Sequence, residues 1–382
     1  MQYRRLGPFK DISILGMGCM RLPVIDGDES RINEPAATHL LHSAVDHGIN
    51  YFDTAYPYHQ GHSETFLGRA LESERLRDRV LLATKLPSWA IESRQDCDRY
   101  LDEQLQRLRT DRIDCYLLHA LKADWWYKLY DLGVLDFLDR AIADGRIGCA
   151  GFSFHDELPL FKEIVDAYDW SFCQIQYNYM DEDIQAGRRG LEYAADKGLG
   201  VIVMEPLRGG HLARPAPAEI QQLWDRSEVQ RSPAEWALRF VWNRPEVTCL
   251  LSGMNDLQQI VENCRIADQT QPGSLSSEEL ALIETVRDTM RKRIKVPCTA
   301  CNYCLPCPAG VNIPRIFSIF NDCFIYGDRL FPHRIYSITM NTAELASNCT
   351  RCGKCEAACP QQIAIMEMLE EAHRVLSKKP ED

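Results

Sequence analysis

The 382-residue sequence has no long apolar run. Its apolar stretches, such as VLLA directly before Thr84, are much shorter than the roughly 20 residues that a membrane-spanning helix needs. We therefore expect no membrane span. The formal net charge is −12, and the one basic knot is RKRIK at 291–295. Nucleic-acid binding needs a clustered basic face, so we expect no nucleic-acid partner and interpret RKRIK as a solvated helix end.

Two further signals are missing from the sequence. Arg4 and Arg5 stand before the apolar run ISILGMG, but this run is short for an export signal and no A-x-A-like cleavage site follows it. We therefore expect a cytoplasmic protein. No G-x-G-x-x-G fingerprint follows a strand-like run, and GHSETFLGRA lacks the glycine pattern, so the sequence contains no independent flavin site.

Cysteine, in contrast, is abundant. Eight of the 16 cysteines form two closely spaced runs, and each run ends in Cys-Pro. The runs are Cys298, Cys301, Cys304 and Cys307, then Cys349, Cys352, Cys355 and Cys359. The second has the bacterial ferredoxin spacing C-x2-C-x2-C-x3-C-P, in which the fourth cysteine binds the other of two clusters. We therefore predict two [4Fe-4S] clusters with crossed ligation, one bound by Cys298, Cys301, Cys304 and Cys359 and the other by Cys349, Cys352, Cys355 and Cys307.

The first cysteine run departs from the ferredoxin spacing. Only Leu305 and Pro306 precede Cys307, where three residues are usual, so a rearranged ligation with Cys323 as a substitute ligand stays open. Structural zinc and disulfides are the two alternatives for paired cysteines. Disulfides need an oxidising compartment, and zinc sites use four ligands rather than two interlocked sets of four, so iron–sulfur clusters fit the pattern better.

Eight short strand-like runs alternate with longer helical stretches before the cysteine runs. They are DISILGMG, NYFDTA, VLLATK, DCYLLH, GCAGFS, FCQIQYN, GVIVMEP and TCLLSG. This alternation predicts parallel βα units, and eight of them match a closed (β/α)8 TIM barrel, with an open doubly wound sheet as the alternative. We predict an α/β barrel over residues 1–275, a helical connector over 276–296 and a small, mainly helical, ferredoxin-like iron–sulfur domain over 297–382.

Local signals predict several helix boundaries. Ser93 is a suitable N-cap for the polar helix that follows it, and Ser232 precedes Pro233, which suits the first position of a helix. Pro245 ends that second helix. The stretch ESERLRDR at 72–79 is amphipathic and is predicted to be helical as well.

Four titratable side chains lie at or near the carboxyl ends of predicted strands. Asp53, Lys85 and His119 end the second, third and fourth strands, and Tyr58 lies in the loop after Asp53. The carboxyl ends of barrel strands meet on one rim, which carries the chemistry of barrel enzymes. Taken singly, these residues are consistent with a structural ion pair, a buried imidazole and a loop aromatic. Their joint placement predicts an active site.

Five motifs in the predicted barrel resemble those of the aldo-keto reductase family. They are DTAYPYHQGHSE, ATKL, YLLHA, GFS and CQIQYN. The resemblance implies that Tyr58 is the proton donor and that Asp53, Lys85 and His119 support it. A free tyrosine has a pKa of about 10, so we expect Lys85 to lower the pKa of Tyr58 and Asp53 to keep Lys85 protonated. We expect neutral His119 to donate a hydrogen bond to the substrate oxygen.

The same resemblance implies a nicotinamide cofactor, with Ser153 and Gln174 at the positions that hold the carboxamide. The full set of residues implied for the cofactor is Gly18, Met20, Arg21, Asp53, Ser153, Gln174, Pro206, Leu207, Gly253, Gln259 and Asn263. The sequence departs from the family pattern at Phe154, where Asn is frequent, and at Met204, where a stacking aromatic is frequent.

The cofactor loops also lack an evident clamp for a 2′-phosphate. Gly253 and Gln259 stand where NADPH-selective members of the family often carry Lys and Arg. Since a phosphate without a charged partner gives up hydration for little return, we expect NADH to bind at least comparably to NADPH.

The two predicted halves handle electrons differently. Nicotinamide exchanges a hydride, whereas an iron–sulfur cluster carries one electron at a time, so coupling them calls for an adapter: a bound flavin or a partner protein, unless the clusters are structural. We predict reduction of an aldehyde or ketone, or oxidation of the alcohol, with clusters that serve a redox partner. The alternative is an electron-transfer adaptor that retains the barrel. Selectivity for the small carbonyl or alcohol substrate would lie in loops such as WWYKLYDLG at 125–133.

Overall fold

The computed structural model describes residues 1–298, 304–359 and 361–380. The chain forms two compact units. The first joins Met1–Arg214 to Arg231–Leu280, and the second joins Pro215–Gln230 to Ala281–Asp382. The segment Pro215–Gln230 lies inside the sequence range predicted for the barrel, yet it belongs to the second unit.

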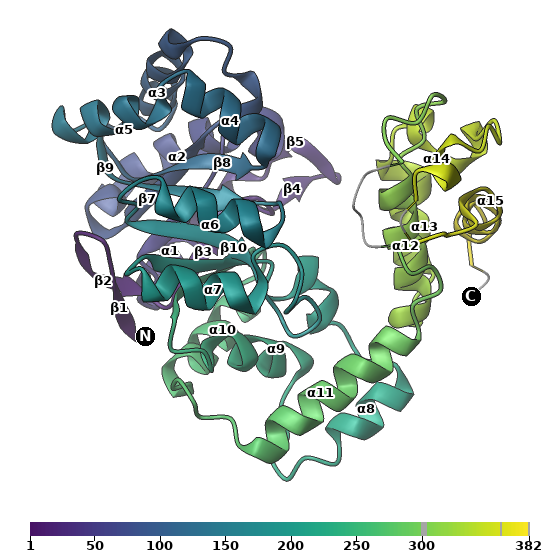
Figure 1. Ribbon diagram of the computed structural model, residues 1–382. Coiled ribbons are helices and arrows are strands. Elements are labelled where there is room, and N and C mark those ends of the chain that lie inside the picture. The colour runs from purple at the N-terminus through teal and green to yellow at the C-terminus, as the bar shows by residue number, and fades with distance from the viewer. Residues whose placement is uncertain (299–303, 360, 381–382) are drawn as a thin grey trace. The chain divides into compact units, whose positions relative to one another are not determined.

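The first unit is built on a closed barrel of eight parallel strands, which helices surround (Figure 1). The strands are β3 (Leu15–Gly18), β6 (Tyr51–Asp53), β7 (Leu81–Leu86), β8 (Ile113–Leu121), β9 (Ile147–Phe154), β10 (Phe172–Gln176), β11 (Gly200–Met204) and β12 (Val247–Ser252). Each pairs in parallel with the next, and β12 pairs with β3 to close the ring. All eight predicted strands are therefore confirmed, and the open sheet is excluded.

The first predicted strand, DISILGMG, divides into two elements. Its beginning belongs to β2 (Phe9–Ser13), which forms an antiparallel hairpin with β1 (Tyr3–Leu6), and only β3 enters the barrel. Leu6 and Ile12 of the hairpin are fully buried in the same apolar cluster as barrel residues such as Tyr51. The hairpin therefore contributes to the core at one end of the barrel rather than extending a strand.

A second hairpin precedes the first barrel helix and was not predicted. It consists of β4 (Val24–Ile25) and β5 (Asp28–Ile32). Asp26 and Gly27 connect the two strands with φ angles of 56° and 73°. This Asp-Gly pair is a known signal for a tight hairpin turn, because both central residues need positive φ.

Helices alternate with the barrel strands and cover the outside of the barrel. They are α1 (Glu34–Asp46), α2 (Ser63–Glu72), α3 (Arg94–Arg107), α4 (Ala123–Asp131), α5 (Val134–Ala143), α6 (Leu158–Asp166), α7 (Gly187–Asp196), α9 (Pro233–Trp242) and α10 (Leu257–Gln269). Ser93 and Asp96 form a capping box at the start of α3, and Ser232 Oγ accepts a hydrogen bond from Glu235 N at the start of α9, so both predicted caps are confirmed. ESERLRDR is not an α-helix: Ser73–Arg79 forms a 3-10 segment that links α2 to β7.

The second unit is mainly helical. Its elements include α8 (Ala218–Trp224), most of α11 (Ser277–Lys292), α12 (Ile313–Ile325), α13 (Leu330–Arg334), α14 (Lys354–Ala357) and α15 (Ile365–Leu376). The apolar faces of α12 and α15 form a core around Phe317, Phe320 and Leu369. No helix in the described part of the chain combines the length and the apolar character needed to cross a membrane.

Candidate functional site

Asp53 and Lys85 form an ion pair inside the barrel rim. Lys85 Nζ donates hydrogen bonds to Asp53 Oδ1 at 2.7 Å, Asp53 Oδ2 at 2.8 Å and the Thr54 carbonyl oxygen at 2.7 Å. The contact follows from the register of β6 and β7, because Asp53 is paired with Ala83 and Lys85 is two residues further along the same face. The side chains are 3% and 1% exposed, so almost no water reaches the pair.

Burial acts on the two members of this pair in opposite ways. It raises the pKa of the Asp53 carboxyl, and the adjacent Lys85 charge opposes that shift. Burial lowers the pKa of Lys85, but the charge of Asp53 and the neighbouring Tyr58 outweigh it and leave the pKa of Lys85 above its usual value. The lysine is therefore held in its charged form.

Tyr58 lies directly above the Lys85 ammonium. Lys85 Nζ is 5.0 Å from the centroid of the Tyr58 ring, and the two side chains interact electrostatically. Burial raises the pKa of the Tyr58 phenol above its usual value, although Lys85 opposes the shift. Our expectation of a lowered pKa is wrong for this structure, because the cost of burying a phenolate exceeds the stabilisation from the lysine. Tyr58 is consequently a protonated phenol at neutral pH.

His119 faces the same space from the end of β8. Its ring centroid is 6.2 Å from that of Tyr58, and the two rings meet edge to face at 81°. Burial and the charges of Lys85 and His155 lower the pKa of His119 well below 6.5, so the imidazole is neutral. Its Nδ1 atom is buried and has no hydrogen-bond partner among the described residues.

Two tryptophans extend the site outward from His119. The Trp89 ring centroid lies 5.2 Å from that of His119 and 5.9 Å from that of Trp125, which belongs to α4. Lys122 Nζ is 4.4 Å from the Trp125 ring centroid. The predicted selectivity segment at 125–133 thus begins next to Trp89, and Trp89 and Trp125 form an aromatic wall that starts at His119.

One cavity of about 290 Å³ opens at this rim. Its lining includes the catalytic candidates Asp53, Tyr58 and His119, and it brings in most of the residues expected to hold the cofactor: Gly18, Met20, Arg21, Ser153, Gln174 and Gly253. Four further lining residues were not among the predicted site residues: His155, Met204, Glu205 and Leu251. His155 and Glu205 directly follow β9 and β11, so the rule of polar residues at strand ends could have identified them.

Four residues predicted for the cofactor do not line this cavity. They are Pro206, Leu207, Gln259 and Asn263. Gln259 Oε1 accepts a hydrogen bond from Asn255 N at 3.0 Å, and Asn263 Nδ2 donates to Ser252 Oγ at 3.3 Å. Both side chains therefore support the loop after β12, and their role toward a cofactor stays a prediction.

The cavity wall fits a nicotinamide carboxamide. Gln174 is 2% exposed, and its Oε1 acceptor has no hydrogen-bond partner in the described part of the chain. Ser153 Oγ, on the neighbouring strand, accepts a hydrogen bond from Ala120 N at 2.7 Å and keeps its own proton for another partner. A buried acceptor beside a free donor complements the N–H and C=O groups of an amide.

Arginines close to the expected dinucleotide loops are already paired with carboxylates. The pairs are Arg21 with Glu205 at 3.1 Å, Arg208 with Asp181 at 3.3 Å and Arg265 with Glu235 at 2.9 Å. Each positive charge is thus compensated within the protein.

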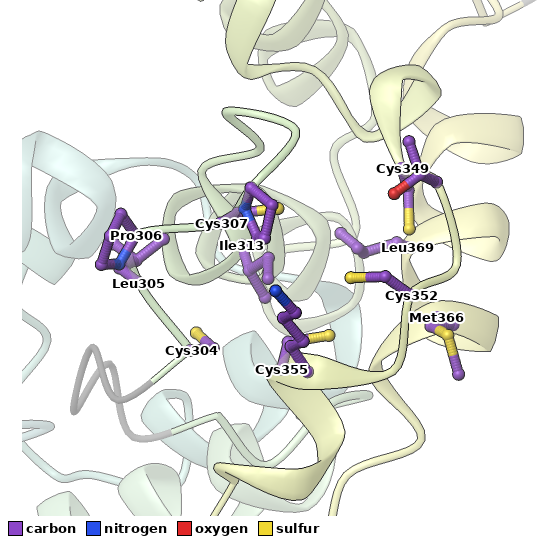
Figure 2. A pocket seen from close by; sticks show the side chains of 13 residues that line it. Cys304, Leu305, Pro306, Cys307, Ile313, Cys349, Cys352, Cys355, Met366 and Leu369 are labelled. Atoms are coloured by element: carbon purple, nitrogen blue, oxygen red, sulfur yellow. The ribbon is translucent and has the colours of Figure 1, made fainter.

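A second cavity, of about 120 Å³, lies among the cysteines of the second unit (Figure 2). Five cysteines from two distant segments line it: Cys304, Cys307, Cys349, Cys352 and Cys355. Cys307 thus shares a cavity with the three cysteines expected to bind the same cluster. Cys298 and Cys359 do not line the cavity, and Cys301 lies outside the described residues.

The arrangement of these thiols differs from a site for one metal ion. Within residues 1–298, 304–359 and 361–380, no three His, Cys, Asp or Glu side chains converge closely enough to hold a single ion. A four-iron cluster binds each thiolate through a separate iron, so its cysteines surround a volume, as they do here. Cys323, the substitute ligand considered above, is buried in the apolar core on α12 and does not line the cavity.

The family model described as aldo/keto reductase family matches residues 14–288. The chain belongs to the aldo/keto reductase family. A second family model, a 4Fe-4S dicluster domain, matches residues 297–364 of this aldo/keto reductase. The first match includes every residue that lines the first cavity, and the second includes all five cysteines that line the second.

Two curated relatives of this aldo/keto reductase match half and three quarters of the chain. The uncharacterized oxidoreductase YqkF of Bacillus subtilis is 36% identical over 319 residues, which cover 75% of the chain and 96% of that protein. The 6-dehydroglucose reductase of Novosphingobium aromaticivorans is 31% identical over 203 residues. That alignment covers 50% of the chain and 64% of the relative, less than two thirds of its length.

Solved structures agree on the fold. The aldo-keto reductase AKR11C1 of Bacillus halodurans, in its holo form, is 26% identical with a TM-score of 0.62, over 75% of this chain and 96% of that one. An aldo-keto reductase of Klebsiella pneumoniae in complex with NADPH is 22% identical with a TM-score of 0.60, over 75% and 95%. At this identity the second likeness concerns the fold alone.

Proposed function

We propose that the barrel reduces an aldehyde or ketone with a nicotinamide cofactor, or oxidises the corresponding alcohol, and that Tyr58 is the general acid. The observation that carries the proposal is the buried Lys85–Asp53 ion pair directly below the Tyr58 phenol. A purely structural ion pair does not account for the Tyr58 phenol next to it, or for His119 in the same cavity as Tyr58, whose buried Nδ1 has no hydrogen-bond partner among the described residues.

The side chains have distinct tasks in this reaction. Tyr58 donates its phenolic proton to the carbonyl oxygen as that oxygen becomes an alcohol, and the Lys85 charge stabilises the phenolate that remains. Asp53 keeps Lys85 charged and holds its ammonium in place. Neutral His119 orients the carbonyl oxygen by a hydrogen bond.

Ser153 and Gln174 would hold the carboxamide of the nicotinamide through the donor and acceptor described above. When bound, this cofactor supplies the hydride that reduces the carbonyl carbon. We propose that NADH binds at least comparably to NADPH, because Gly253 and Gln259 offer no charge to a 2′-phosphate. The arginines near the expected dinucleotide loops, Arg21, Arg208 and Arg265, each lie beside a carboxylate. The complex with NADPH was observed for the Klebsiella pneumoniae protein and describes the cofactor of that protein.

The aromatic wall suits a carbonyl substrate with an apolar or ring-shaped body. Trp89 lies next to His119 and Trp125 lies next to Trp89, and sugar or aromatic rings pack well on the flat faces of such side chains. The 6-dehydroglucose reductase among the relatives is named for a sugar substrate, which makes oxidised sugars a sensible first group to test.

We further propose that the second unit carries two [4Fe-4S] clusters on the eight cysteines of its two runs and exchanges single electrons with a redox partner protein. The cavity that brings Cys307 together with Cys349, Cys352 and Cys355 supports the crossed arrangement, in which Cys304, which lines the same cavity, binds the other cluster. We include no flavin, because neither family match names one.

The test is a turnover assay on anaerobically purified protein. A panel of sugar-derived, aromatic and aliphatic carbonyls is offered with NADH and with NADPH, and oxidation of the cofactor is followed by absorbance. We expect turnover on at least one class, reduced by orders of magnitude in Tyr58→Phe. If no carbonyl or alcohol is turned over by protein with its full iron content, the barrel is not a carbonyl reductase and the electron-transfer alternative gains.

A further inference from the structure

His59, the residue directly after Tyr58, is held by two hydrogen bonds to another segment of the chain. Its Nε2 accepts from Leu22 N at 3.2 Å, and its Nδ1 lies 2.9 Å from the Glu29 carbonyl oxygen. A backbone N–H can only donate and a carbonyl can only accept, so these partners require the neutral imidazole with its proton on Nδ1. His59 is 5% exposed, so both bonds are shielded from water.

The backbone after Tyr58 has an unusual conformation. His59 has φ 52° and ψ 44°, Gln60 has φ 53° and ψ 34°, and Gly61 has φ 90°. For His59 and Gln60 this left-handed conformation costs free energy, and it persists only where surrounding contacts compensate. The two imidazole hydrogen bonds are contacts of that kind, since they tie the turn to a segment 30 or more residues away.

The segment at the other end of these bonds forms part of the cavity wall. Met20 and Arg21 line the cavity, and Leu22 follows them directly. The beginning of this segment is anchored on the catalytic strand, because Cys19 N donates to the Asp53 carbonyl oxygen at 2.8 Å. His59 anchors its other end through Leu22. The Tyr58 turn and the wall formed by Met20 and Arg21 are thus joined by one side chain.

We propose that His59 is a positioning residue for the proton donor: it sets the Tyr58 phenol relative to the wall formed by Met20 and Arg21. This inference rests on the proposed function, in which Tyr58 donates the proton. The imidazole touches neither substrate nor cofactor in this role. It acts by restricting the turn, so that the phenol stays at the distance at which proton transfer is efficient.

The test distinguishes the effect of losing the imidazole hydrogen bonds from the effect of the left-handed backbone conformation. His59→Gly removes both hydrogen bonds but tolerates positive φ, whereas His59→Ala removes them and keeps the conformational cost. His62→Ala, at an exposed position in the same turn, is the matched control. For each variant, kcat and its solvent deuterium isotope effect are measured on an accepted carbonyl, and the dissociation constant of the nicotinamide is measured by titration. The thermal midpoint monitors folding.

We expect kcat to fall roughly ten- to a hundredfold in both His59→Gly and His59→Ala. We also expect a larger solvent isotope effect, because proton transfer becomes the slower event. The nicotinamide dissociation constant should change less than kcat, because Cys19 still anchors the segment, and His62→Ala should behave as wild type. A folded His59→Gly with wild-type kcat and isotope effect would overturn the inference. If Tyr58→Phe were also fully active, the proposed function itself would have failed, so the two failures are distinguishable.

Discussion

Lys85 Nζ lies 2.7 Å from Asp53 Oδ1 and 2.8 Å from Asp53 Oδ2, in a part of the barrel where both side chains are almost completely buried. An ion pair in such a place gains little net stability, since both charges lose their hydration. Breaking it by removing one partner is costly, because the other charge is left buried alone. The pair is therefore better suited to a role in catalysis than to stabilising the fold. Removing one of its charges should lower the free energy of unfolding markedly.

We predict that Asp53→Asn destabilises the barrel by about 3–5 kcal/mol, since the Lys85 ammonium loses its compensating charge. The double variant Asp53→Asn with Lys85→Met should lose clearly less than the sum of the two single variants. The free energy of unfolding of the single and double variants is measured by urea titration, with tryptophan fluorescence as the signal. Asp46→Asn, which removes the exposed partner of Arg79, is the control and should change stability by less than about 1 kcal/mol. Additive losses would show that Asp53 and Lys85 do not depend on each other.

His119 predicts a pH dependence of stability. Its pKa in the folded protein lies well below 6.5, so between that value and 6.5 the unfolded chain binds a proton that the folded protein does not. Stability should thus fall as the pH is lowered through this window, by at most about 1.4 kcal/mol per pH unit for one group. In His119→Gln this part of the pH dependence should disappear. An unchanged pH profile in the variant would contradict the lowered pKa.

Gln259→Arg should improve NADPH binding by about 1–3 kcal/mol, the size of a hydrogen bond to a charged group, and leave NADH binding nearly unchanged. The reason is that Gln259 lies in the first turn of α10, where its uncharged side chain accepts a hydrogen bond from Asn255 N in the loop after β12. The dissociation constants of NADH and NADPH are measured by titration into the anaerobic wild-type protein and into the variant. A hundredfold preference of the wild type for NADPH would show that one of the paired arginines leaves its carboxylate to bind the phosphate.

The cysteine cavity predicts metal content. Anaerobically purified protein should contain about eight iron and eight acid-labile sulfide per chain, with a brown colour that dithionite bleaches. Cys355→Ser should lose about half of the iron, whereas Cys323→Ser, in the core on α12, should keep all of it if it folds. Stoichiometric zinc without labile sulfide, or iron loss confined to Cys323→Ser, would contradict the assignment of ligands.

The barrel could be predicted from the sequence because its strands are short, buried and regularly spaced, and because caps such as Ser93 and Ser232 give local signals. The same rule of strand ends led to Asp53, Lys85 and His119. The division of DISILGMG between β2 and β3 could not be predicted, since a run of apolar residues does not show where it turns from a hairpin into the barrel.

Other features of the site depend on three-dimensional surroundings that one sequence does not contain. The raised pKa of Tyr58 follows from burial, which outweighs the nearby lysine. The hydrogen bonds of His59 join residues more than 25 positions apart, and no local pattern indicates them. His155 and Glu205, in contrast, directly follow β9 and β11, so the sequence does contain a signal for them: they are polar residues at strand ends, as His119 is.

The most direct test of the central claim is a single-turnover measurement on Tyr58→Phe. Protein loaded anaerobically with reduced nicotinamide is mixed rapidly with an accepted carbonyl, and oxidation of the bound cofactor is followed in the variant and in the wild type. We predict that the variant binds the cofactor as tightly as the wild type but oxidises it orders of magnitude more slowly, because only the phenolic proton has been removed. Oxidation at the wild-type rate would contradict the assignment of Tyr58 as the proton donor.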